Sequence, residues 1–341
     1  MASVIIIIYE IILSIIYLFY VCNYAFSLHY SGGNYHGQIT SIIIVDKFGN
    51  GNFTKVQDAV NSVPVNNYLW ICIHVRAGIY NEKVTISKEK RYIILEGEGR
   101  RITVIQSADG GEFLKTSTFS LFASNFVARK ITFKNIHDHQ MSLRPAPAAI
   151  ISGDKAAFFE CGFMSVQDTL TDSLGRHYFE SCYIQGAVDF IWGDGQSIYR
   201  RCTINVTYEV TKGNDVGYIT AQARHGAKSK SGFVFVECSI VGTIGSIYLG
   251  RAYTIHSRVL FYKSRLEGRI APQGWLPWYS AGKVNDVVFA EEGCRGDGAN
   301  RSKRVRWEKR LSNKEVESLV NVDVFINNDG WLNKLPTPLH T

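Results

Sequence analysis

The chain has 341 residues, of which 46% are hydrophobic and 20% are charged, and it contains only 7 prolines. This composition is typical of a globular protein with one large or two modest domains, and it excludes a disordered or collagen-like chain. The formal net charge of +7 favours an anionic partner. The basic residues are scattered rather than clustered with aromatic residues, which argues against nucleic acid as that partner.

An apolar stretch at the start of the chain, residues 4–22, predicts a targeting segment, although no Lys or Arg precedes Lys47. We expect residues 1–25 to be a signal peptide, and the alternative is an uncleaved N-terminal anchor. Secretion fits the three glycosylation sequons, which begin at Asn52, Asn205 and Asn300. For a basic chain outside the cell, an acidic polysaccharide is the better candidate partner.

Short patterned stretches follow the apolar segment. NFTKVQDAVNSVP (52–64) has the pattern of an amphipathic helix that caps the N-terminal end of the fold. Residues 70–75, 92–97 and 103–106 are apolar stretches that predict strands. The middle of the chain then repeats one pattern: aromatic or aliphatic residues, a polar pair, Cys or Ser, and further β-formers. The repeats are AFFECGF (157–163), HYFESCYI (177–184), SIYRRCTI (197–204), FVFVECSI (233–240) and VLFYKSRL (259–266).

The spacing of these repeats predicts the architecture. Cys161, Cys182 and Cys202 are 21 and 20 residues apart, and a period in this range is typical of a solenoid. The repeats alternate with a period of two, so each one predicts strands. We therefore predict an all-β fold, a parallel β-helix with about 20–25 residues per coil. A peripheral helix is expected in SNKEVESLV (312–320), whose Ser and Glu have the spacing of a capping box.

Two aspartates occupy similar places in neighbouring repeats. Asp168 in QDTL and Asp189 in AVDFIWG are 21 residues apart. Strands of successive coils lie about 4.8 Å apart, so the two carboxyl groups could stack side by side. Two carboxylates that close cannot both ionise easily, which suits a general acid beside an anionic nucleophile. Two turn-capping aspartates at equivalent repeat positions fit the spacing equally well.

The spacing of the cysteines and histidines limits which cofactors the chain could hold. No CxxC pair or Cys/His cluster has the spacing of metal ligands, so we expect no metal site. Six of the seven cysteines follow the predicted signal peptide, and in an oxidising compartment some of them are candidates for disulfides. The column of cysteines in the repeats could instead be a ladder of stacked thiols.

Several ordered motifs resemble one family, the pectin methylesterases, and above all its plant members. They are SGDKAAFFECGF, QDTL, GRHYFESCYIQGAVDFIWG and YLGRAY, together with GIYNEKV (78–84) and the C-terminal INNDGWL (326–332). The resemblance implies one catalytic domain over residues 43–335, folded as a right-handed parallel β-helix with short capping helices and preceded by no pro-region. It also implies hydrolysis of the methyl esters of homogalacturonan in the cell wall to pectate and methanol, without a cofactor.

The resemblance assigns chemical roles by position. Asp189 falls on the family's nucleophile and Asp168 on its general acid/base. Gln167 falls on a donor that stabilises the oxyanion, and Arg251 falls on the arginine that pairs with the nucleophile. These residue types suit the chemistry, because an arginine keeps the nucleophilic carboxylate ionised, and the negative charge of that carboxylate favours the protonated form of the neighbouring acid.

The resemblance also suggests substrate-binding and structural residues. Tyr253 and Trp275 fall on aromatic positions of the substrate cleft, and packing in the core is the alternative for Trp275. Relatives suggest a disulfide between Cys202 and Cys238. His177, which lies in a predicted strand, is interpreted as structural.

The chain departs from the family pattern just before SGD. Where the family has Gln-Ala-Val-Ala-Leu this chain has PAPAA (145–149), so Pro145 replaces a glutamine that donates to the oxyanion. Loss of one such donor costs on the order of 10²–10³ in rate. Gln140, five residues upstream, is a candidate substitute. Asp194 and Trp192 also replace a common Asn and Phe, but they leave both catalytic aspartates intact.

Three functions therefore stand open. The first is an active pectin methylesterase, a secreted monomer that acts on pectin and that a pectinesterase inhibitor protein could bind. The second is a catalytically impaired relative that binds pectin or such an inhibitor, and Pro145 is the only residue that suggests it. The third is another pectin-acting β-helix enzyme, since a retaining glycosidase needs carboxyl groups about 5–5.5 Å apart.

Overall fold

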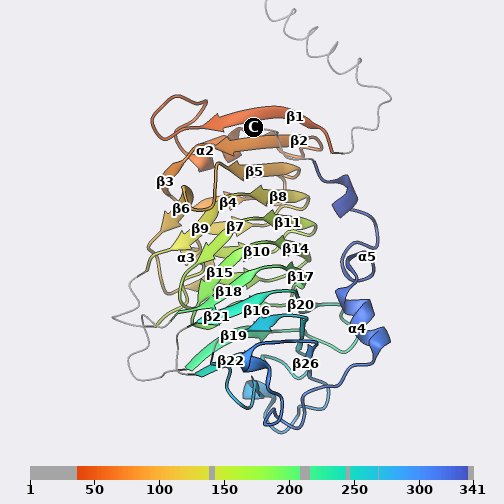
Figure 1. Ribbon diagram of the computed structural model, residues 1–341. Helices are drawn as coiled ribbons and strands as arrows, with labels where there is room; N and C mark the ends of the chain where they lie inside the picture. Colours follow the sequence, from red (N-terminus) through yellow and green to blue (C-terminus); the bar gives the residue numbers. More distant parts are fainter. Residues whose placement is uncertain (1–36, 138–142, 208–215, 243–245, 268, 337–341) are drawn as a thin grey trace, which may run out of the picture. The chain divides into compact units, whose positions relative to one another are not determined.

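The computed structural model describes residues 37–137, 143–207, 216–242, 246–267 and 269–336 (Figure 1). The predicted signal peptide, residues 1–25, and Gln140 lie outside these ranges. The chain divides into two units, Met1–Gln38 and Ile39–Thr341, and the second unit holds nearly all of the described residues. Within the described ranges, no helix is both long and apolar enough to cross a membrane.

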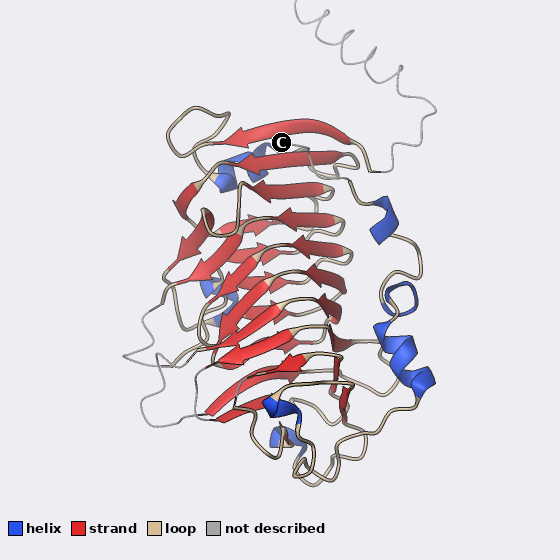
Figure 2. Cartoon of the chain, viewed as in Figure 1, coloured by secondary structure: helices blue, strands red, loops and turns tan. Residues whose placement is uncertain are grey.

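Strands of the second unit form three sheets of ten, eight and eight strands, with every pair parallel (Figure 2). Sheet 1 contains β1 (Ile39–Val45), β2 (Trp70–Val75), β5 (Ile93–Gly97), β8 (Phe126–Arg129), β11 (Ala156–Phe159), β14 (Arg176–Glu180), β17 (Gln196–Arg200), β20 (Gly232–Val236), β23 (Arg258–Tyr262) and β26 (Val288–Glu292). Sheet 2 contains β3 (Gly78–Asn81), β6 (Thr103–Ser107), β9 (Thr132–Asn135), β12 (Gly162–Met164), β15 (Tyr183–Gly186), β18 (Thr203–Val206), β21 (Ser239–Gly242) and β24 (Arg265–Leu266). Sheet 3 contains β4 (Val84–Ile86), β7 (Phe119–Leu121), β10 (Ala149–Ile151), β13 (Leu170–Asp172), β16 (Val188–Gly193), β19 (Val216–Gln222), β22 (Ser246–Arg251) and β25 (Trp275–Leu276).

From β2 onward, the chain visits the three sheets in the same order in each coil. From β14 it passes to β15 in sheet 2 and β16 in sheet 3, and β17 then pairs with β14. His177 pairs with Ser197, and Ala156 pairs with His177, so the coils advance by 20 and 21 residues here. This is the right-handed parallel β-helix that the repeat predicts, and the repeats in the sequence are its coils.

Stacked aromatic rings fill the interior along the axis. Phe158, Phe179, Tyr199, Phe235 and Phe261 are in register on sheet 1, and successive ring centroids lie 4.9, 4.6, 4.6 and 4.5 Å apart. These separations equal the strand spacing of a parallel sheet, so each coil places its ring directly on the previous one. The aromatic residue of each repeat is therefore a core residue.

A left-handed residue turns each coil from sheet 1 into sheet 2. Glu160, Ser181, Arg201 and Glu237 have φ angles of 53°, 54°, 52° and 56°. A side chain in this conformation carries a steric cost, which stacked neighbours with the same turn help to offset. Each turn residue precedes a buried cysteine, which explains the polar pair followed by Cys in the repeat.

The cysteines form a ladder of thiols rather than a bridge. All six cysteines in the described residues are free. Cys202 donates its thiol hydrogen to Phe179 O at 3.6 Å, and Cys238 donates to Tyr199 O at 3.3 Å. The disulfide between Cys202 and Cys238 that the resemblance suggests is therefore absent from the structure, where each thiol is paired with a carbonyl instead.

Helices lie at the end and side of the coils. The expected capping helix is α2 (Val56–Ser62), where Val56, Ala59 and Val60 are buried and Glu82 accepts hydrogen bonds from the first backbone amides. The helices α4 (Asn313–Val320) and α5 (Val322–Phe325) pack against the outer face of sheet 1, and α4 begins with the predicted capping box at Ser312. The remaining helices are short, namely α3 (Phe113–Thr116) and the 3-10 turns η1 (Trp278–Ser280), η2 (Asp297–Ala299) and η3 (Leu332–Lys334).

Candidate active site

The register of the coils brings Asp168 beside Asp189. Gln167 forms a parallel bridge with Val188, and the Asp168 amide donates to Val188 O at 3.1 Å. Asp168 follows Gln167 and Asp189 follows Val188, so the two aspartates lie side by side on successive coils. This adjacency is what the 21-residue spacing predicts.

The backbone holds both aspartates in an uncommon left-handed conformation. Asp168 and Asp189 have φ angles of 57° and 48°, a left-handed conformation that Asp tolerates better than most residues. The register between β16 and β19 shifts between Val188 and Ile191, so an irregularity falls on Asp189. Bulges of this kind redirect side chains and are frequent beside active sites. Sites that retain such strain are candidates for function.

Arg251 anchors the carboxylate of Asp189. Its Nε donates to Asp189 Oδ1 at 2.6 Å, and its Nη2 donates to Oδ2, so the pair is bidentate. Arg251 ends β22, two strands away from β16 in sheet 3, and its guanidinium reaches across β19. The guanidinium carbon lies 4.3 Å from the centroid of the Tyr218 ring and 3.7 Å from that of Trp278. These aromatic contacts hold the cation in place and shield it from water.

The two carboxyl groups differ in their protonation. Burial and then the charge of Asp189 raise the pKa of Asp168 from its ordinary value to about 7. Burial also raises the pKa of Asp189, but the hydrogen bonds and charge of Arg251 oppose that rise. Because Asp168 has no bidentate cation of its own, it holds the proton of the pair more tightly. The arrangement thus favours a proton on Asp168 over a proton on Asp189.

A cleft of about 460 Å³ surrounds these groups. Its lining residues are Gln167, Asp168, Asp189, Trp192, Ala221, Arg251, Tyr253, Trp278 and Tyr279. The predicted catalytic residues, the oxyanion donor and Tyr253 thus share one cavity. Among the residues that the structure describes, no group of three or more His, Cys, Asp or Glu side chains is placed to hold a metal ion.

Aromatic rings form one side of the cleft. Tyr253 lies 6.0 Å from Trp192, 5.5 Å from Trp278 and 5.6 Å from Tyr279, measured between ring centroids. Tyr253 and Tyr279 are 41% and 68% exposed, so their faces are open to a ligand. An apolar aromatic surface beside a few polar groups is the usual composition of a carbohydrate or small-molecule site.

The prediction that Trp275 belongs to the cleft is wrong. Its side chain is fully buried, and its ring lies 4.6 Å from that of Phe289 in the core. Trp275 is the register partner of Gly250, where a Cβ atom would lie 2.1 Å from the Thr220 hydroxyl and 3.3 Å from the indole. The glycine of LeuGlyArg thus leaves room chiefly for Thr220, and the indole packs closely beside it. Trp278, three residues later in GWLPW, lines the cleft together with Trp192, and the sequence analysis missed it.

Pro145 lies one coil before Gln167. The amide of Ala146, the next residue, donates to Gln167 O at 3.3 Å, and Pro145 O accepts from the Gly111 amide at 3.0 Å. Pro145 carries no side-chain donor, so Gln167 is the amide side chain that lines the cleft. The proposed substitute, Gln140, lies outside the described residues.

His177 takes part in a buried structural network. Its Nδ1 lies 2.5 Å from Asp172 Oδ1, its Nε2 lies 3.0 Å from Gly153 O, and the Tyr199 hydroxyl donates to Asp172 at 2.6 Å. The side chains of Asp172 and His177 are completely buried and do not line the cleft. This supports the structural interpretation of His177.

Comparison with known proteins shows the family to which the chain belongs. The family model described as Pectinesterase matches residues 42–329. The chain is 45% identical to probable pectinesterase 29 of Arabidopsis thaliana, over 87% of this chain and 90% of the relative. It is 46% identical to probable pectinesterase 55 of the same plant, over 86% and 91%. The structure superposes on pectin methylesterase from carrot with a TM-score of 0.81 and 28% identity, covering 91% of this chain and 99% of that one. The chain therefore belongs to the pectinesterase family of carboxylic ester hydrolases.

Proposed function

We propose that the chain hydrolyses the methyl esters of homogalacturonan to pectate and methanol, with Asp189 as nucleophile and Asp168 as general acid/base. The observation that carries the proposal is the pair of adjacent carboxyl groups with opposite environments. Asp189 is held by the bidentate Arg251, whereas the pKa of Asp168 rises to about 7. A neutral acid beside an ionised nucleophile is what acyl transfer through an anhydride requires.

The first half of the reaction forms the acyl-enzyme. A carboxylate oxygen of Asp189 attacks the ester carbonyl, and Gln167 donates a hydrogen bond to the oxyanion that develops. When the tetrahedral intermediate collapses, the bond to the methoxy oxygen breaks. Asp168 gives its proton to that oxygen, and methanol leaves. The products of this half are an anhydride on Asp189 and an ionised Asp168.

The second half releases the acid. Asp168, now a carboxylate, takes a proton from a water molecule, and the resulting hydroxide attacks the anhydride. The bond to Asp189 breaks, so the carboxylate of Asp189 and the protonated Asp168 are restored. Arg251 stabilises Asp189 as it leaves, because both carboxylate oxygens already accept its hydrogen bonds.

The open aromatic rings suit the sugar part of the substrate. Tyr253 and Trp278 line the cleft beside the catalytic pair, and Tyr253 is 41% exposed. Apolar faces of a sugar ring pack on aromatic side chains, so these residues position the esterified galacturonate. We propose that the chain acts as a secreted monomer on cell-wall pectin and is open to regulation by a pectinesterase inhibitor protein.

Pro145 favours a second candidate, a catalytically impaired relative that binds pectin or an inhibitor protein. With Gln167 as the side-chain amide donor of the cleft, the oxyanion is stabilised less than with two such donors. One missing donor corresponds to a loss on the order of 10²–10³ in rate. Pro145→Gln tests this candidate, because it should raise methanol release strongly if the second donor is what the chain lacks.

The test of the main proposal measures methanol and polymer length together. The purified chain should release methanol from highly methylated pectin without shortening it, and Asp189→Asn should abolish the release. Asp58→Asn, on the exposed side of α2, is the matched control and should leave release unchanged. Shortening of the polymer without methanol release would instead indicate a glycosidase.

A further inference from the structure

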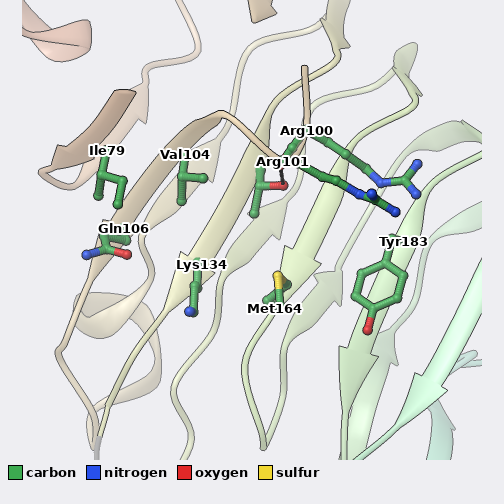
Figure 3. A pocket seen from close by; sticks show the side chains of 9 residues that line it. Ile79, Arg100, Arg101, Val104, Gln106, Lys134, Met164 and Tyr183 are labelled. Carbon is green, nitrogen blue, oxygen red and sulfur yellow. Dashed lines mark hydrogen bonds between the residues drawn. The ribbon is translucent and has the colours of Figure 1, made fainter. Parts of the chain in front are cut away.

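A second pocket of about 480 Å³ lies on the outer face of sheet 2 (Figure 3). Its floor consists of outward-facing residues of neighbouring strands, and the turn that contains Arg100 and Arg101 covers it from one side. In Figure 3 both arginine side chains extend over the sheet in the direction of Tyr183. No residue that lines this pocket also lines the cleft of the catalytic pair.

A glycine keeps the floor of the pocket closely packed. Gly162 lies between Thr132 and Tyr183 in the row of register partners that crosses β9, β12 and β15. A Cβ atom at Gly162 would lie 2.2 Å from the Thr132 hydroxyl, so no larger residue fits without displacing its neighbour. The Thr132 side chain therefore takes the place beside Gly162, and it lines the pocket together with Met164 and Tyr183.

The pocket carries three positive charges and no negative one. Arg100, Arg101 and Lys134 line it, and none of the lining residues is Asp or Glu. Some other surface cations are paired, as Lys83 is with Asp109 and Arg265 with Glu267. The three pocket cations form no ion pair with any residue that the structure describes. Three unneutralised cations in one concave site attract a ligand with several negative charges.

The remaining lining residues suit a sugar. The Tyr183 hydroxyl donates to Gln185 at 2.8 Å and accepts from Asn205 at 2.8 Å, so the ring is fixed in place. Met164 and the fixed ring of Tyr183 give the floor an apolar part, on which a sugar ring can lie. Guanidinium groups bind carboxylates through paired hydrogen bonds, which two adjacent arginines can do twice.

The pocket is close to the catalytic cleft along the chain. Met164 precedes Asp168 by four residues, and Tyr183 precedes Asp189 by six. A fully extended chain of four to six residues spans about 14–21 Å at most. Met164 and Tyr183 therefore lie on the coils that carry the catalytic pair, whereas Arg100, Arg101 and Lys134 lie on the two coils before them.

We propose that this pocket is a binding site for ionised galacturonate residues of de-esterified pectin, the polyanion that the proposed reaction produces. The inference rests on the proposed function, because its ligand is the product of that reaction. Unmethylated galacturonates carry one carboxylate per sugar, whereas methylated ones are neutral. The pocket thus holds the chain on pectin that has already been demethylated and keeps the catalytic cleft near it.

The test measures the binding of fully de-esterified polygalacturonate, which contains no ester to hydrolyse. The pocket variant Arg100→Gln/Arg101→Gln/Lys134→Gln is compared with a control that removes the same charge from exposed residues outside the pocket, Lys303→Gln/Arg306→Gln/Lys314→Gln. At low salt the pocket variant should lose about tenfold in affinity, and the control less than about twofold. A single Arg101→Gln variant, which alters only an exposed side chain, provides the comparison if the triple variant unfolds.

Two further binding measurements distinguish this pocket from the catalytic cleft and from attraction to any polyanion. The cleft variant Tyr253→Ala/Trp278→Ala should keep most of the affinity for polygalacturonate, and polyglutamate of equal charge should bind more weakly than the polysaccharide. Equal losses in the two charge variants, a loss confined to the cleft variant, or equal binding of polyglutamate would each overturn the proposal. Methanol release from methylated pectin by the wild type reports on the proposed function separately.

Discussion

Replacing Arg251 with glutamine should remove the charge that keeps Asp189 ionised. The Asp189 side chain is 8% exposed and that of Arg251 17%, so water screens the pair little. Removal of one partner from a buried ion pair costs about 3–5 kcal/mol. If this cost falls on the ionised nucleophile, it corresponds to a fall in kcat of between about 10² and 10⁴, since about 1.4 kcal/mol is tenfold. Uptake of a proton by Asp189 would relieve the cost to folding, but it would also neutralise the nucleophile, so protonation is one route to this loss of kcat.

The assay is initial methanol release from methylated pectin at pH 7, with thermal unfolding to confirm that the variant is folded. Arg251→Lys keeps the charge but loses the second parallel hydrogen bond, so it should retain more activity than Arg251→Gln. Arg306→Gln, an exposed arginine outside the cleft, is the control for loss of charge. A folded Arg251→Gln variant with kcat within about tenfold of wild type would refute the ion pair as the source of the active carboxylate.

Three other predictions concern the acid, the tryptophans and the buried network. Because the pKa of Asp168 is raised to about 7 and its protonated form is the acid, kcat/KM should fall as pH rises through about 7; a profile that is flat to pH ~9 would contradict this role. Trp278→Ala should raise KM, whereas Trp275→Ala should cost about 3–5 kcal/mol of unfolding free energy, measured by denaturant titration; the reverse pattern would show that the two assignments are exchanged. Asp172→Ala leaves the Tyr199 hydroxyl without its acceptor and should cost more than about 2 kcal/mol, with Asp172→Asn costing less; equal melting temperatures for both variants and the wild type would contradict the network.

Much of the fold could be predicted because the β-helix repeats itself in the sequence. The interval from Cys161 to Cys182 and Cys202 equals the advance of the coils, and the aromatic residue of each repeat falls on the core side of sheet 1. Once the coil length is known, the adjacency of Asp168 and Asp189 follows from their spacing alone. Local chemistry predicts the helix at Ser312, because a capping box depends only on residues within one turn.

The parts that were missed depend on contacts between distant segments. Whether Trp275 or Trp278 faces the cleft depends on the register of β25 against β22, which places Trp275 opposite Gly250. Nothing within GWLPW distinguishes the two tryptophans. The state of Cys202 and Cys238 likewise depends on which carbonyl lies nearest each thiol, and a resemblance to relatives does not determine that.

We propose that the Asp168–Asp189 pair hydrolyses a methyl ester, although Pro145 stands where the family pattern has a glutamine. The most direct measurement is methanol release from highly methylated pectin by the purified chain, with Asp168→Ala measured alongside. The account predicts release by the wild type and little or none by the variant. A folded wild type that releases no methanol, or an Asp168→Ala variant that matches the wild type, would contradict it.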